Sequence, residues 1–137
     1  MPAFGANLIP EATAPSSAQE REAVAEKFVE RELQAWQGRM ELQDWKIRIH
    51  LVRSDMLEPR TLGNVKWDTD SKEATIGVLS SYDYQLPFDA MLGDMEVTVV
   101  HELVHLELAA IPHSPASRSQ EEHAVVALTH ALLSMVK

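Results

Sequence analysis

Residues 98–108 read Thr-Val-Val-His-Glu-Leu-Val-His-Leu-Glu-Leu and place two histidines and a glutamate in an otherwise apolar run. His101 and His105 are four positions apart, so their imidazoles would project from the same face of a helix. Two imidazoles placed in this way can bind one zinc ion (Zn²⁺) at about 2.0–2.1 Å. Glu102, one position further round, would sit beside a water molecule that the metal activates, where it can accept a proton. The motif therefore predicts two metal ligands and a general base.

A third protein ligand is expected, because catalytic zinc usually has three protein ligands and one open position. The segment Gln120-Glu121-Glu122-His123 offers carboxylates about sixteen residues after His105, a distance that suits a second helix folded back against the first. Glu121 and Glu122 each begin a largely apolar stripe, so periodicity leaves both open. If Ser119 were the N-cap of this helix, Glu122 could instead serve in a capping box.

The run His101-Glu102-Leu103-Val104-His105, with a glutamate on the next helix, resembles the zincin metallopeptidases of the gluzincin branch, which have a thermolysin-type ligand set. The expected order of elements is similar to a minimal zincin domain. The resemblance implies hydrolysis of peptide bonds by a zinc-activated water, with a peptide or protein as substrate. Ligand glutamates of this branch are often followed by a small or apolar residue three positions on and later by Leu-Leu. Val125 and Leu132-Leu133 match this register best from Glu122, which favours Glu122 as the third ligand.

The chain also departs from the patterns of related families. Thermolysin-like enzymes usually carry an aspartate four residues after the ligand glutamate, where this chain has Val125 or Val126. A metzincin-like site would need a glycine and a further histidine where Leu108 and Ile111 stand. His113 is a weaker candidate ligand, because Pro112 makes its direction unpredictable.

Two parts of the proposed chemistry are expected by residue type or by family analogy. The candidates for stabilising the developing oxyanion are Tyr82, Tyr84, His113 and His130. The substrate is expected to lie in extended form along an edge strand above the motif helix, for which Thr75–Leu79 is the predicted strand.

The elements that must position these residues follow from hydrophobic periodicity. Ser17-Ala18-Gln19-Glu20 has the spacing of a capping box. The predicted elements are a helix at about 18–39, strands at 45–51, 62–67 and 75–79 with a hairpin turn at 68–72, a buried helix at about 89–110, and a last helix from 117 or 119 to 136. The β-branched run 97–100 taken alone favours a strand, but the histidine spacing makes chemical sense only on a helix. The sequence thus predicts an α+β domain at 18–137, with a three- to four-stranded sheet, after a flexible arm at 1–17.

Composition narrows the function classes. The formal net charge is −9 and the chain has no cysteine, which argues against a nucleic-acid partner and excludes disulfides and thiolate zinc sites. We found no apolar run long enough to cross a membrane and no typical leader, so a cytoplasmic location is expected. Trp36, Trp45 and Trp67 are predicted core residues. His50, His123 and His130 are predicted surface residues, and no chemical role is predicted for Glu107. The competing hypothesis is a non-catalytic, zinc-stabilised module that binds a protein.

Overall fold

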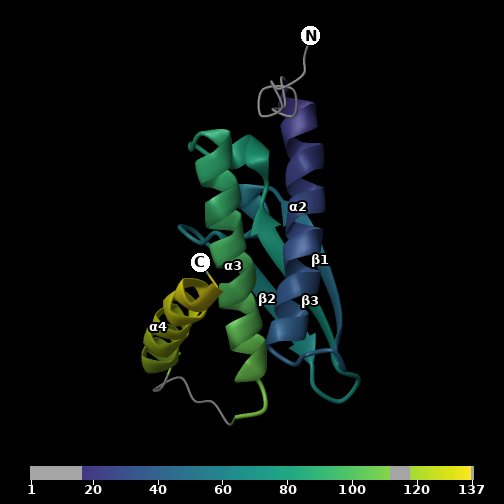
Figure 1. Cartoon of the computed structure of the whole chain (residues 1–137), viewed down its shortest axis with the longest axis vertical. Coiled ribbons are helices and arrows are strands. Elements are labelled where there is room, and N and C mark those ends of the chain that lie inside the picture. The colour runs from purple at the N-terminus through teal and green to yellow at the C-terminus, as the bar shows by residue number, and fades with distance from the viewer. Residues whose placement is uncertain (1–16, 112–117, 137) are drawn as a thin grey trace.

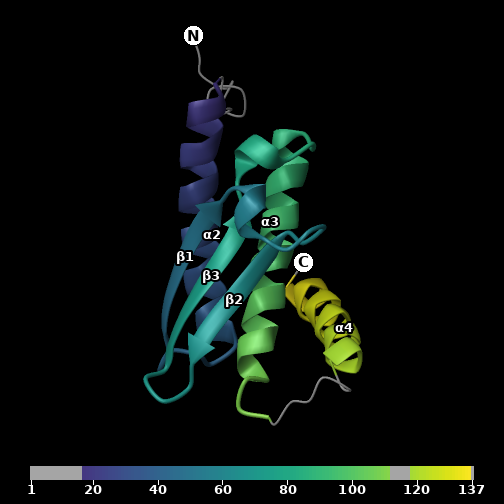
Figure 2. The same cartoon turned by 180° about the vertical axis from the view of Figure 1, so that it is seen from behind.

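The computed structural model describes residues 17–111 and 118–136. Its elements are α2 (Ala18–Arg39), β1 (Lys46–Val52), the 3-10 turn η1 (Ser54–Met56), β2 (Gly63–Asp68), β3 (Glu73–Leu79), the 3-10 turn η2 (Ser81–Asp83), α3 (Phe88–Glu107) and α4 (Arg118–Val136). Helices α2 and α3 cover one face of a three-stranded sheet, and α4 lies against α3 (Figures 1 and 2). This is an α+β fold, as predicted. The predicted arm lies outside the described residues except for Ser17.

Helix α2 begins where the sequence predicts. Ser17 is the N-cap, its side chain accepts a hydrogen bond from the backbone N–H of Glu20, and the Glu20 side chain accepts one from the backbone N–H of Ser17. This reciprocal pair satisfies N–H groups that a helix start leaves without partners. The helix buries one stripe at helical spacing: Ala25, Val29, Leu33 and Trp36. That stripe packs α2 onto the sheet and onto α3.

The sheet has the order β1-β3-β2, with β1 parallel to β3 and β2 antiparallel to it. The three strands and the hairpin between β2 and β3 were predicted within one or two residues of their observed bounds. The choice of 75–79 as the edge strand was wrong, because β3 is the central strand. Strand β2 is the edge that lies beside α3.

Trp67 is a second correction. It is paired with the buried Ala74 and so faces the helical side of the sheet, but it is 39% exposed. The reason is its position near the end of the edge strand, where it is covered less than the residues of β3. Trp36, by contrast, is 1% exposed and donates a hydrogen bond from its indole N–H to the buried Glu96 (3.0 Å).

Helix α3 is the centre of the domain. It contacts both other helices as well as β2 and β3, and half of its residues are buried. The β-branched run 97–100 is helical, as the histidine spacing required. The helix ends at Glu107, three residues before the predicted end, and a turn follows. Local β propensity is overridden here because burial on almost every side stabilises the helix.

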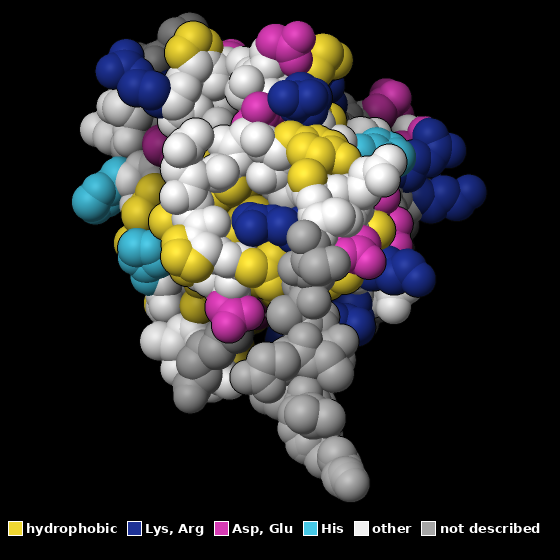
Figure 3. Space-filling model, turned by 90° about the horizontal axis from the view of Figure 1, so that it is seen from above, with side chains coloured by type: hydrophobic (Ala, Val, Ile, Leu, Met, Phe, Trp, Pro, Cys, Tyr) yellow, Lys and Arg dark blue, Asp and Glu magenta, His cyan; other side chains and the backbone are white. Residues whose placement is uncertain are grey.

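Helix α4 packs on α3 mainly through Val125 and Thr129, its two buried residues, with Leu132 and Leu133 partly buried. Seen from above in Figure 3, Lys and Arg side chains lie interspersed with Asp, Glu and apolar groups. No helix among the described residues combines the length and hydropathy needed to cross a membrane.

Candidate metal centre

The two motif histidines project next to each other from α3. Their ring centroids are 5.1 Å apart and their planes are inclined by 62°. Each side chain is a little more than one-fifth exposed. Burial lowers the pKa of His101, the Glu122 carboxylate opposes this effect, and the neighbouring His105 lowers the pKa further. A lowered pKa favours the neutral imidazole, which is the form that binds metals.

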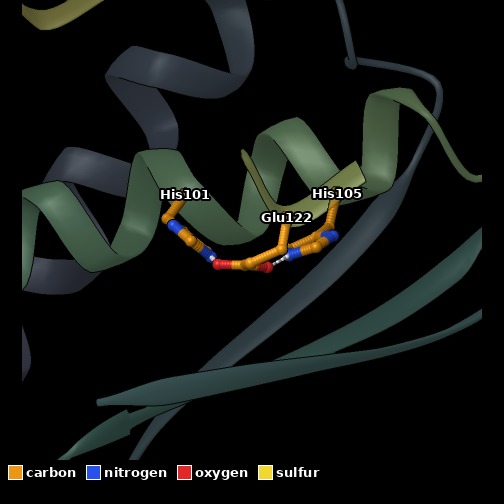
Figure 4. Close-up of side chains that lie close together, drawn as sticks. All are labelled: His101, His105 and Glu122. Atoms are coloured by element: carbon orange, nitrogen blue, oxygen red, sulfur yellow. Dashed lines mark hydrogen bonds and ion pairs between the residues drawn. The ribbon is translucent and has the colours of Figure 1, made fainter. Parts of the chain in front are cut away.

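Glu122 bridges the two histidines from α4 (Figure 4). Its Oε2 lies 3.0 Å from Nε2 of His101, and its Oε1 lies 3.0 Å from Nε2 of His105. One ligand atom from each of the three residues can be chosen so that all lie within 4.8 Å of one another. The structure therefore brings together the three residues predicted as ligands, and this group could hold a metal ion.

Glu121, the alternative that periodicity left open, approaches the same histidine from its other side. Its Oε2 lies 3.2 Å from Nδ1 of His105. The Glu121 side chain is 19% exposed, whereas that of Glu122 is 50% exposed. Each nitrogen of the His105 ring thus faces a different carboxylate. Val126, where thermolysin-like enzymes would have an aspartate, is 40% exposed.

Glu102 points toward the sheet side of α3 and is only 6% exposed. Burial raises its pKa to about 7; His105 lowers it and the Glu122 carboxylate raises it. A β-carbon placed on Gly63 would lie 3.4 Å from Oε2 of Glu102 and 2.5 Å from Cγ2 of Thr98. The absence of a side chain at Gly63 thus lets the edge strand pass close to the carboxylate.

A groove of about 1290 Å³ runs along the edge strand and contains this cluster. Strand β2 and the segment before it form one wall, and α3 with the first turn of α4 forms the other. His101, Glu102, His105, Glu121 and Glu122 all line it. Trp67, which is 39% exposed, lines the groove too.

Of the residues predicted to stabilise an oxyanion, the three that the structure describes do not line the groove. Tyr84 donates a hydrogen bond to Asp94 (2.8 Å), and burial followed by this bond raises its pKa. Tyr82 is 45% exposed and stacks under Arg53, while His130 is exposed on α4. His113 lies outside the described residues. Arg118, which does line the groove, was missed; its position one helical turn before Glu122 was the available signal.

Comparisons of this chain with protein-family models, with curated proteins and with solved structures found no match. The functional argument therefore depends on the site itself.

Proposed function

We propose that this chain is a zinc-dependent peptidase with a zincin-like domain, in which His101, His105 and Glu122 hold the metal. The observation that carries the proposal is the convergence of these three side chains from two helices, with Glu102 next to them in a groove. Two imidazoles and one carboxylate form one of the ligand sets that catalytic zinc uses.

The spacing of the donor atoms fits this assignment. Ligand atoms bound to one tetrahedral zinc at 2.0–2.2 Å lie roughly 3.3–3.6 Å apart. The two contacts between histidine nitrogens and Glu122 oxygens are 3.0 Å. These contacts use different oxygens of Glu122, and one donor atom from each residue lies within 4.8 Å of the others, so the side chains would have to close around an ion.

Zinc bound here would supply Lewis-acid polarisation of a carbonyl and lower the pKa of a water molecule. Glu102 would accept the proton of the attacking water at a carboxylate oxygen and then deliver it to the leaving amine. A pKa of about 7 suits both transfers, because a group that titrates near neutral pH accepts and releases protons readily. Arg118 is a cation in the same groove and a candidate to stabilise negative charge that develops on the carbonyl oxygen.

The edge strand β2 offers a binding mode for an extended peptide. Because β2 pairs with β3 on one side only, its other side presents backbone N–H and C=O groups along the groove. A peptide could add to it as a further strand, held by main-chain hydrogen bonds. Strand β2 replaces 75–79 as the proposed substrate-binding strand.

A non-catalytic zinc-stabilised module is the second candidate. The observation in its favour is that Glu122 joins α4 to α3, so a metal at this point would fasten the two helices together. It predicts bound zinc without hydrolysis.

The test is to measure zinc content and hydrolysis of a peptide library by the wild-type protein, Glu102→Gln and Glu107→Gln. Glu107 is exposed on the same helix and serves as the matched control. The peptidase proposal predicts about one zinc per chain in all three proteins and loss of hydrolysis in Glu102→Gln alone. Hydrolysis that Glu102→Gln leaves unchanged, or zinc without any hydrolysis in the wild type, would overturn it.

A further inference from the structure

We infer that Glu121 is a positioning residue, which fixes the ring orientation and tautomer of His105 so that its Nε2 is free to bind the metal. The inference rests on the proposed metal site but not on catalysis. Its basis is the contact of 3.2 Å between Oε2 of Glu121 and Nδ1 of His105, on the side of the ring opposite Glu122.

The chemistry of imidazole explains why this contact matters. A neutral imidazole carries one N–H, and a metal needs the lone pair of the other nitrogen. A carboxylate can only accept a hydrogen bond. When Nδ1–H donates to Glu121, Nε2 is left as the ligand atom, and histidine ligands commonly make such a second hydrogen bond.

Glu122 competes for the opposite tautomer in the metal-free protein. Its Oε1 is 3.0 Å from Nε2 of His105, close enough to accept a hydrogen bond from an Nε2–H. That tautomer could not bind a metal through Nε2. The Glu122 contact is the shorter one, 3.0 Å against 3.2 Å, but Glu121 is the less exposed carboxylate, and a less hydrated carboxylate makes the stronger charge-assisted hydrogen bond. Glu121 therefore shifts His105 toward the tautomer that the metal requires.

The neighbouring residues have separate roles in this arrangement. Glu122 contacts Nε2 of both histidines and is the proposed ligand, whereas Glu121 contacts Nδ1 of His105. Loss of Glu122 should remove a ligand, and loss of Glu121 should weaken a site that still has its ligands.

The test compares Glu121→Gln, Glu122→Gln and Gln120→Ala with the wild type in the full chain. Gln120 is exposed on the same turn of α4 and is the matched control. Zinc affinity is measured by competition with a chromophoric chelator, and hydrolysis is assayed in parallel. Glu121→Gln should bind zinc about 10–100-fold more weakly than the wild type while keeping one zinc per chain at saturation. Gln120→Ala should stay within about twofold of the wild type, and Glu122→Gln should lose more affinity than Glu121→Gln.

The tautomer of metal-free His105 provides a second readout, because loss of Glu121 would not change it if Glu121 had a purely structural role. Ring ¹⁵N chemical shifts, recorded at a pH where the imidazole is neutral, should show a larger Nε2–H population in Glu121→Gln. Unchanged affinity or unchanged ring shifts in this variant would overturn the inference, as would a wild-type protein that binds no zinc. Zinc binding with the expected variant effects but without hydrolysis would overturn the peptidase proposal and support the role of Glu121.

Discussion

Replacing Glu102 with glutamine should stabilise the metal-free protein by an amount that grows with pH. Burial raises the pKa of Glu102 from 4.5 to about 7. The folded protein keeps this proton up to about pH 7, whereas the unfolded chain releases it near pH 4.5. The unfolded chain therefore binds fewer protons between these values, and the contribution of Glu102 to the free energy of unfolding falls as the pH rises through this window.

The magnitude follows from the two pKa values. A difference of about 2.5 corresponds to roughly 3 kcal/mol, since one pKa unit is about 1.4 kcal/mol. Because glutamine does not ionise, the free energy of unfolding of Glu102→Gln should not fall in this way as the pH rises. The difference in free energy of unfolding between the variant and the wild type should be nearly constant below pH 4.5, grow by roughly 3 kcal/mol up to pH 7, and level off above it.

The assay is urea unfolding of both proteins in the presence of chelator from pH 4 to pH 8. Glu30→Gln, at an exposed position of α2, is the control and should change the free energy of unfolding by less than about 0.5 kcal/mol. A difference between Glu102→Gln and the wild type that does not vary with pH would refute the reasoning, because it would mean that the Glu102 carboxylate is solvated in the folded protein.

Three further predictions concern how the site is supported. Gly63→Ala would place a β-carbon 2.5 Å from Cγ2 of Thr98 and 2.8 Å from the carbonyl oxygen of Gly77. This substitution should lower the free energy of unfolding in urea by about 1–3 kcal/mol. Gly93→Ala, where a β-carbon would have nothing within 4 Å, should instead stabilise α3 by about 0.5–1 kcal/mol. Equal effects of the two substitutions would contradict the close approach of β2 to α3. Trp36→Phe removes the indole donor to buried Glu96 and should cost about 1–3 kcal/mol; a loss below 0.5 kcal/mol would show that this bond contributes little. Thr129→Val removes a buried hydroxyl that has no hydrogen-bond partner in the described part of the chain, so the melting temperature should rise. A lower melting temperature would indicate that the hydroxyl of Thr129 does make a hydrogen bond in the folded protein.

The parts of the fold that depend on local pattern were predictable from the sequence. The capping box at Ser17 and the helical periodicity of residues 18–39 are short-range signals, and both are confirmed. The spacing of His101 and His105 correctly predicted a helix through a β-branched run. Each of these features depends on residues within a few turns of one another, where periodicity is informative.

The remaining features depend on how elements meet in space. Strand order is set by pairing between segments distant in sequence, so the edge position of β2 could not be read from alternation in Thr75–Leu79. The roles of Glu121 and Glu122 depend on how α4 is rotated against α3, and apolar stripes run from both residues. The exposure of Trp67 follows from the same strand order, since a tryptophan on a central strand would have been covered.

In the proposed metal site, the position of Glu122 on α4 makes metal affinity depend on the docking of that helix. The two other ligands belong to the central helix, whereas α4 fully buries only Val125 and Thr129 among its residues. Any fraction of molecules in which α4 is undocked lacks a ligand, and the apparent affinity falls in proportion to the docked fraction. Val125 lies on the part of α4 that faces α3, and a substitution there could favour the undocked state. Once most molecules are undocked, each further 1.4 kcal/mol in favour of undocking would lower the zinc affinity about tenfold. The hydrophobic contacts of α4 would thus set the metal concentration at which the site fills.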